Sequence, residues 1–142
     1  MKKKFFKKRE TLSFVIPCYN CENFIEKNIK KLVNKIKNYK IQYEIILVND
    51  SSKDNTRRIL NKLKSTYSKL KVFHNKNNKG KSYSLIYGIK KTKGRRIIIY
   101  DCDFPYFQFL NKVIKKVLLH QLVIIDRRHK KSKIIANNLT TY

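Results

Sequence analysis

Hydrophobic residues in this chain form short continuous runs, and between the runs apolar positions recur every three or four residues. The continuous runs predict strands at Leu12–Pro17, Tyr43–Val48, Lys71–His74, Arg95–Tyr100 and Gln121–Ile125. The helical spacing predicts helices at Glu22–Lys37, after the polar loop Asn49–Thr56, at Gly80–Thr92 and between Phe107 and Leu118. The pattern is therefore one of strands that alternate with helices.

This alternation predicts an α/β fold, a Rossmann-like sheet of mostly parallel strands with helices on both faces. Ligands of such sheets bind at the carboxyl ends of the strands. We expect a basic arm at residues 1–10, one domain at residues 11–133 and a tail at residues 134–142, long enough for a short helix at most.

Two acidic residues follow the apolar run Ile97–Tyr100, which is typical of a strand buried on both faces in the middle of a parallel sheet. Strand side chains alternate, so we expect Asp101 and Asp103 on one side, with Cys102 turned away and Pro105 ending the strand. Such a pair suits Mg²⁺ or Mn²⁺ that also binds substrate phosphates. The alternative is that both acids only make the strand end soluble.

The ends of the other predicted strands are also polar. Because parallel strands end at the same edge of a sheet, these residues are expected to rim one crevice. Three of the nine acidic residues, Asp50, Asp101 and Asp103, belong to this set. The remaining members are Tyr19, Asn20, Asn49 and Asn75 to Asn78.

Composition adds a strong positive charge. The 142 residues include 35 Lys and Arg against nine acids, a formal net charge of +26. Such a charge suits nucleic acid, anionic lipid head groups or phosphorylated substrates. The sequence lacks the first glycine of a P-loop before Gly80-Lys81-Ser82, and with three glycines it has no G-x-G-x-x-G motif.

The sequence shows no signal peptide and no apolar run of membrane-spanning length, so we expect a cytoplasmic protein. Its three cysteines, an odd number, favour free thiols in a reducing compartment. Cys18 and Cys21 with Cys102 are compatible with zinc or redox chemistry, but scattered histidines and the lack of a second ligand pair favour simple packing.

Four sequence blocks resemble the family 2 glycosyltransferases of GT-A fold. The blocks are Ser13–Glu26, Tyr43–Thr56, His74–Lys81 and Asp101–Asp103, and they occur in the family's order. The resemblance implies that Pro17, Tyr19 and Glu22 line a nucleotide pocket, that Asp50 contacts the base and that Lys81 lies near the pocket. It also implies that Asp101 and Asp103 hold a divalent metal and the diphosphate.

The segment Leu122–Lys133 resembles the strand and basic loop of polyprenyl-phosphate sugar transferases, the dolichyl-phosphate mannose or glucose synthases. By this resemblance Arg127 serves a phosphate group and Arg128 assists. The sequence departs from the family at Ile125-Asp126, where Gly-Ser is usual, and at Pro105, where the mannose branch has a polar residue.

The implied reaction is an inverting displacement from a UDP- or GDP-sugar to an acceptor such as a polyprenyl phosphate. A lipid phosphate needs no general base, and the chain has no acid after Asp126. We also expect attachment to anionic membranes through Met1–Arg9 and Arg127–Lys133.

Two alternatives remain open. One is a donor-binding subunit, truncated after the nucleotide-binding half and weakly active unless a partner chain or second copy completes the site. The other is a nucleic-acid-binding protein that uses the positive charge without metal.

Overall fold

The computed structural model describes residues 11–39, 41–120, 122–125 and 134–137. The chain divides into two units, Met1–Phe104 and Pro105–Tyr142, and each is described by itself. No helix of the described residues has the length and apolar character needed to cross a membrane.

The first unit contains a parallel sheet whose described strands run in the order β3-β2-β1-β4. Its strands are β1 (Thr11–Cys18), β2 (Gln42–Asn49), β3 (Leu70–His74) and β4 (Arg96–Ile99). Its helices are α1 (Ile25–Lys37), α2 (Thr56–Thr66) and α3 (Lys81–Lys90). The predicted α/β fold is confirmed, with element ends shifted by a few residues.

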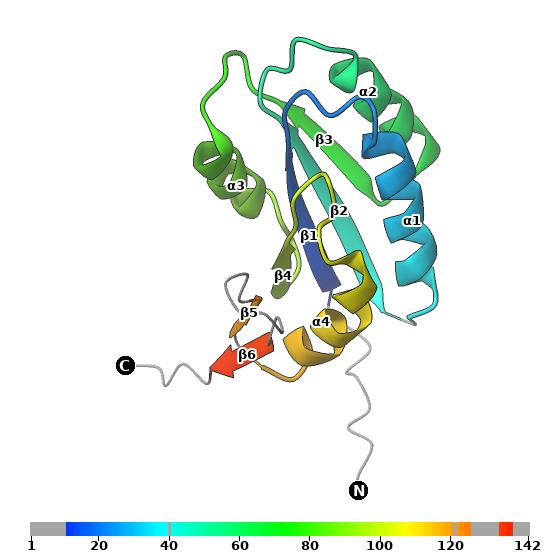
Figure 1. Cartoon of the computed structure of the whole chain (residues 1–142), viewed down its shortest axis with the longest axis vertical. Coiled ribbons are helices and arrows are strands. Elements are labelled where there is room, and N and C mark those ends of the chain that lie inside the picture. Colours follow the sequence, from blue (N-terminus) through cyan, green and yellow to red (C-terminus); the bar gives the residue numbers. More distant parts are fainter. Residues whose placement is uncertain (1–10, 40, 121, 126–133, 138–142) are drawn as a thin grey trace, which may run out of the picture. The chain divides into compact units, whose positions relative to one another are not determined.

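Helices cover the sheet of this unit on both faces (Figure 1): α1 and α2 lie on one side and α3 on the other. Alternate residues of β1 and β2 supply the two cores because successive strand side chains point to opposite faces. On the α3 face, Val15, Ile46 and Val48 are fully buried. A side chain at Gly88 would collide with Val15, so α3 lies directly on the strands.

Strand β4 corrects one prediction. Among the described strands it forms an edge of the sheet, and Ile99 is 50% exposed, so the run Ile97–Tyr100 is not a central strand buried on both faces. The central positions belong to β1 and β2, which are longer and almost wholly buried. A run of β-branched residues fits both kinds of strand, so the sequence pattern did not separate them.

The amino ends of the strands are joined by Glu44, which is 6% exposed. Its carboxylate accepts hydrogen bonds from Ser13 Oγ at 2.7 Å, Lys71 Nζ at 2.7 Å and the backbone N–H groups of Lys93 and Gly94. A Cβ at Gly94 would lie 2.4 Å from Ser13 Oγ, so only glycine allows this approach. Glu44 therefore fixes the turn between α3 and β4.

The second unit contains the short helix η1 (Phe107–Phe109), α4 (Leu110–Val117) and the strands β5 (Leu122–Ile125) and β6 (Ile134–Asn137). Strands β5 and β6 pair antiparallel in a two-stranded sheet of their own. The predicted strand before residue 126 is present, but the short helix expected after residue 133 is wrong. Its isoleucines favour a strand once a partner strand is available.

Candidate functional site

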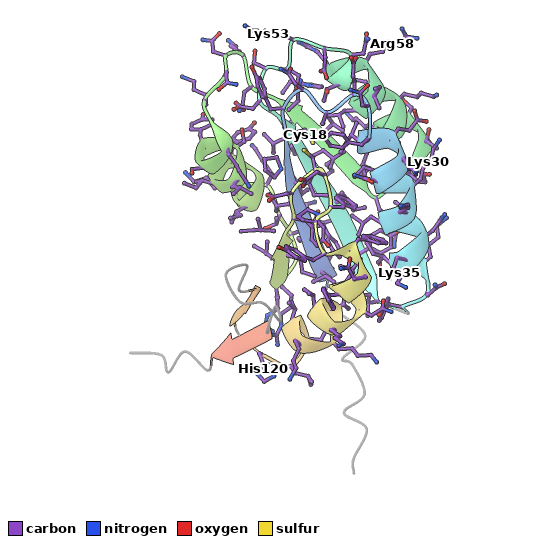
Figure 2. The ribbon with its side chains drawn as sticks, in the orientation of Figure 1. Cys18, Lys30, Lys35, Lys53, Arg58 and His120 are labelled. Atoms are coloured by element: carbon purple, nitrogen blue, oxygen red, sulfur yellow. The ribbon has the colours of Figure 1, made fainter. Side chains whose placement is uncertain are left out.

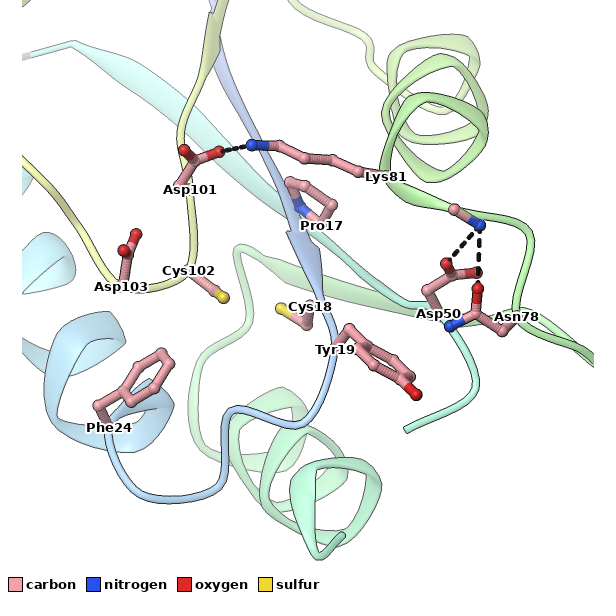
Figure 3. A pocket seen from close by; sticks show the side chains of 11 residues that line it. Pro17, Cys18, Tyr19, Phe24, Asp50, Asn78, Lys81, Asp101, Cys102 and Asp103 are labelled. Atoms are coloured by element: carbon pink, nitrogen blue, oxygen red, sulfur yellow. Dashed lines mark hydrogen bonds and ion pairs between the residues drawn. The ribbon is translucent and has the colours of Figure 1, made fainter. Parts of the chain in front are cut away.

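A pocket of about 470 Å³ opens at the carboxyl ends of β1, β2 and β4, all within the first unit (Figure 3). This is the edge at which the sequence predicts a crevice. Five of the polar residues expected there line it. The lining residues are Pro17, Cys18, Tyr19, Phe24, Asp50, Asn78, Gly80, Lys81, Asp101, Cys102 and Asp103.

Asp50 follows β2 and is 3% exposed. Its Oδ1 accepts the backbone N–H of Lys79 at 2.9 Å and the Asn75 amide at 2.7 Å, and its Oδ2 accepts the Gly80 N–H at 2.7 Å. Burial raises the pKa of Asp50, but these hydrogen bonds outweigh it and hold the pKa below its usual value. In the structure Asp50 therefore shapes the loop that leads into α3.

Gly80 is the last residue of that loop and has a φ of +84°. Residues with a Cβ rarely adopt this conformation, although nothing lies within 4 Å of a Cβ built here. The glycine is thus needed for the backbone and not for space. It directs its N–H at Asp50 while Lys81 begins the helix.

Asp101 and Asp103 lie on a turn beyond β4, which ends at Ile99. The turn is closed by a hydrogen bond of 3.0 Å from Phe104 N to Asp101 O, and Asn28 on α1 donates to Cys102 O at 2.9 Å. Strand alternation does not present the two acids, as the sequence pattern suggested, and Pro105 lies well beyond the strand end. Helix α1 and a tight turn present them instead.

The Cys102 side chain points toward Cys18 in Figure 3, while the carboxylates of Asp101 and Asp103 point elsewhere. Tyr100 packs edge-on against Phe104 with ring centroids 5.0 Å apart. Burial, together with the charges of Asp101 and Asp103, raises the pKa of Tyr100 to about 12. The acidic turn thus rests on an uncharged aromatic pair.

Lys81 reaches across the pocket from the start of α3. Its Nζ lies 2.6 Å from Asp101 Oδ1, and the two side chains are 56% and 25% exposed (Figure 3). The resemblance to known transferases implied only that Lys81 lies near the pocket. The ion pair adds that one of the two predicted metal ligands has a cation beside it.

Glu22 is not among the residues that line the pocket. Its Oε2 accepts the backbone N–H of Asn55 at 2.8 Å, and its own N–H donates to Asp54 Oδ2 at 3.1 Å. Asp54 also accepts the N–H of Thr56, the first residue of α2, at 3.0 Å. Glu22 therefore joins the start of α2 to the loop after β1.

The described residues include none of Arg127, Arg128 and the basic segments Met1–Arg9 and Arg127–Lys133. Their expected contacts with phosphate and membrane stay predictions. The same holds for the roles in nucleotide and metal binding assigned to the residues that line the pocket.

Three residues with positive φ stand immediately after predicted site residues. Asn20 follows Tyr19 with a φ of 46°, Ser51 follows Asp50 with 57°, and Phe104 follows Asp103 with 54°. Such conformations cost about 1–3 kcal/mol each and are common at functional sites. Each of the three directly follows a residue that lines the pocket.

The acidic turn fits a divalent cation held by few protein ligands. Asp103 is exposed, and no described residue donates a hydrogen bond to its carboxylate or pairs with it. Within the part of the chain that the structure describes, no group of three or more His, Cys, Asp or Glu is arranged to hold a metal. Mg²⁺ commonly binds one or two carboxylates and takes its other ligands from water and phosphate.

The three cysteines are free thiols, with Cys18 and Cys21 buried. A hydrogen bond with Cys102 lowers the pKa of Cys21, but a hydrogen bond with Cys18 and burial raise it further, to about 12. A protonated thiol is a poor nucleophile and a poor metal ligand. The packing interpretation of the cysteines stays a prediction.

Sequence reasoning missed Phe24 and Gly80 as pocket residues and Asn28 as the support of the acidic turn. Phe24 stands just before α1, and an apolar residue at this position carries no sequence signal for a ligand. Asn28 carried a weak signal, since it is a polar residue between the apolar positions Ile25 and Ile29. No sequence pattern reports that it reaches Cys102.

Comparison with protein families gives one match over most of the chain. Residues 13–140 match the model of the family described as glycosyl transferase family 2. An uncharacterized glycosyltransferase from Synechocystis sp. is 38% identical over 92 residues, which cover 65% of this chain and 29% of that protein. A dolichyl-phosphate beta-glucosyltransferase from Trichomonas vaginalis is 27% identical over 133 residues, covering 86% and 41%. The chain thus spans less than half of these relatives.

Among solved structures, the chain resembles the mannosyltransferase PcManGT from Pyrobaculum calidifontis, determined in complex with GDP-Man and Mn²⁺. The TM-score is 0.62 at 21% sequence identity, and the match covers 73% of this chain and 31% of that one. At this identity the likeness shows the fold, which is the GT-A glycosyltransferase fold that the sequence blocks implied.

Proposed function

The chain belongs to glycosyl transferase family 2, and from this premise we propose that it binds a nucleoside-diphosphate sugar in the pocket at the carboxyl ends of β1, β2 and β4. The bound sugar is then transferred to an acceptor, for which we propose a polyprenyl phosphate. Transfer follows a direct displacement with inversion at the anomeric carbon.

One observation carries the donor half of this proposal: one pocket is lined by a lysine at the start of α3 and by three carboxylates, one after β2 and two on the turn after β4. Lys81 supplies positive charge for phosphate oxygens, and Asp101 with Asp103 supplies oxygen ligands for a metal. The volume of about 470 Å³ lies in the usual range for small-ligand sites. A neighbour of the same fold was solved with GDP-Man and Mn²⁺, which supports a donor of this class.

Asp101 and Asp103 are the residues that would hold Mg²⁺ or Mn²⁺. When bound, such an ion neutralises charge that develops on the leaving diphosphate. The protein's own part is to hold both carboxylates on a closed turn. Asn28 and Phe104 fix the backbone of that turn, so this backbone does not have to be ordered when the ligand arrives.

The proposed acceptor rests on relatives named dolichyl-phosphate beta-glucosyltransferases and on the basic segment that includes Arg127. A phosphate monoester has a second pKa of about 6, so it arrives ionised and attacks the anomeric carbon without a general base. The bond from that carbon to the diphosphate breaks as the new bond to the acceptor oxygen forms. We further propose that Met1–Arg9 and Arg127–Lys133 attach the protein to anionic membranes.

Calorimetry with UDP-glucose and GDP-mannose, each with Mn²⁺ and with EDTA, tests the donor site. We expect one of the two to bind with Mn²⁺ and to lose most of its affinity in EDTA. No binding of either, together with metal-independent, salt-sensitive binding of DNA or RNA, would favour the nucleic-acid alternative. A radiolabelled transfer assay with polyprenyl phosphate then tests the acceptor.

A further inference from the structure

The ion pair between Lys81 and Asp101 places an ammonium group on a carboxylate to which the proposed function assigns a metal. From this geometry we infer that Lys81 is an exchangeable counter-ion, a positioning residue that occupies Asp101 until a metal-diphosphate ligand arrives and then moves to a phosphate oxygen. This inference rests on the proposed function. Its consequence is that the metal and the nucleotide bind together, and that metal alone binds weakly.

Hydrogen bonds fix the backbone at both Lys81 and Asp101, while the Lys81 side chain remains able to move. Gly80 N–H is bound to Asp50, and α3 starts at Lys81, so the Lys81 Cα is fixed. The Lys81 side chain itself is 56% exposed and reaches Asp101 over four rotatable bonds. A small rotation of that side chain exchanges one partner for the other.

Charge explains why the exchange is needed. A divalent cation that approaches Asp101 meets a positive group 2.6 Å from its ligand oxygen, in a chain of formal net charge +26. If a metal alone displaced Lys81 from Asp101, the ammonium group would gain only hydration in return. With a diphosphate present it gains charge-assisted hydrogen bonds, which are about twice as strong as neutral ones. The anion thus supplies the alternative partner that releases Asp101.

Asp103 provides an internal contrast. Its carboxylate is exposed and has no cation beside it among the described residues, so it is open to a metal at all times. Lys81 therefore controls one of the two ligands and leaves the other available. Free metal is expected to contact Asp103 first and to engage Asp101 only with the nucleotide.

The test compares Lys81→Met with Lys81→Arg and with Lys90→Met, which removes the same charge from an exposed position at the other end of α3. Paramagnetic broadening of the Asp101 and Asp103 amide signals during Mn²⁺ titration reports metal binding without nucleotide. We expect Lys81→Met to bind Mn²⁺ alone about fivefold more tightly. The same variant should bind the nucleotide with Mn²⁺ about tenfold more weakly.

These opposite signs are the signature of an exchanged partner. Lys81→Arg should resemble the unaltered protein in both titrations, and Lys90→Met should change neither by more than about twofold. An equal gain in Mn²⁺ affinity in Lys90→Met reduces the effect to general charge and overturns the inference. Nucleotide affinity unchanged in Lys81→Met also overturns it.

The proposed function and this inference fail in different ways. If the unaltered protein binds no nucleotide sugar under any condition, the proposed function is wrong. If nucleotide binds with Mn²⁺ but Lys81→Met leaves Mn²⁺ binding unchanged, only the inference is wrong. Amide spectra of each variant without ligand confirm that the fold is retained.

Discussion

Carboxylates lie at both ends of the parallel sheet, and their burial and hydrogen bonding differ between the two ends. At the amino ends of the strands, Glu44 is buried and accepts hydrogen bonds from two side chains and two backbone N–H groups. At the carboxyl ends, Asp103 is exposed and receives none from the described residues. Asp50 and Asp101 are intermediate, since each has protein partners but also lines the pocket.

The difference indicates that the acid at the amino ends of the strands has a structural role. A buried carboxylate requires several donors, because removal from water is costly unless its oxygens are satisfied. Glu44 meets that condition and has no capacity for a ligand. The acids at the other end retain that capacity because solvent, a movable lysine or a loop backbone surrounds them. Substitutions at the two ends of the sheet should therefore affect stability and ligand binding differently.

The largest effect is expected at Glu44. Glu44→Ala leaves Ser13, Lys71 and two backbone N–H groups without their acceptor, and we expect the free energy of unfolding to fall by about 3 kcal/mol. Urea denaturation followed by circular dichroism measures this loss. Glu26→Ala, which removes a partly exposed acid of α1 that pairs with the surface residue Lys30, is the control and should leave the midpoint nearly unchanged. A stable Glu44→Ala protein would contradict the structural role.

At the acidic turn we expect a loss of ligand affinity with little change in stability, in contrast to Glu44. Asp103→Asn should reduce affinity for the nucleotide sugar in Mn²⁺ by about 100-fold, because a neutral amide replaces a carboxylate ligand of the proposed metal. The free energy of unfolding should stay within about 0.5 kcal/mol, since the replaced side chain is exposed and accepts no hydrogen bond from the described residues. Calorimetry and urea denaturation on the same preparation separate the two effects. Unchanged affinity would remove Asp103 from the proposed metal site.

Asp50 should show a smaller effect with a defined pH dependence. Asp50→Asn keeps one acceptor oxygen and loses the other, so we expect unfolding to require about 2 kcal/mol less at pH 7. The folded-state pKa of Asp50 lies below its usual value, so its stabilisation is complete above about pH 4. It is lost as the pH falls through the folded pKa.

Denaturation at a series of pH values between 7 and 3 checks this sign. The difference between the unaltered protein and Asp50→Asn should be constant at the upper end of the range and shrink below about pH 4. A difference that grows toward low pH would contradict the hydrogen-bond assignment. Glu44, whose pKa is also held low by Lys71 and Lys93 against the effect of burial, should contribute to acid unfolding in the same direction.

The smallest effect concerns backbone strain at the pocket edge. Ser51 has a φ of 57°, so Ser51→Gly removes a strained conformation but also increases the freedom of the unfolded chain. We expect a net gain in unfolding free energy of about 0.5 kcal/mol, measured as a rise in the midpoint of thermal unfolding. Thr66→Gly, at the end of α2, is the matched control and should lower the midpoint.

Basic side chains show a third pattern, distinct from both ends of the sheet. Lys30 and Arg58 project outward from α1 and α2 in Figure 2, and Lys30 pairs with Glu26 on the same helix. Pairs of this kind contribute little to stability in water. The positive charge of the helices is therefore available to anionic partners, whereas Lys81 and Lys71 are engaged with particular carboxylates.

The sequence by itself determined the class of fold, the positions of most elements and the edge of the sheet where the site lies. Local forces encode these features. Runs such as Phe14–Ile16 are apolar enough to fix a buried strand. Parallel strands then bring Tyr19, Asp50 and Asp101 to one edge without further information.

Only the tertiary structure decided which strand lies at the edge of the sheet, which acids have protein partners and which side chains hold the acidic turn. Asn28 and Cys102 are 74 residues apart in sequence, and Lys81 meets Asp101 from another element. Such contacts depend on the packing of α1 and α3 against the sheet. Local sequence patterns do not predict these contacts, because residues far apart in sequence come together only when the chain folds.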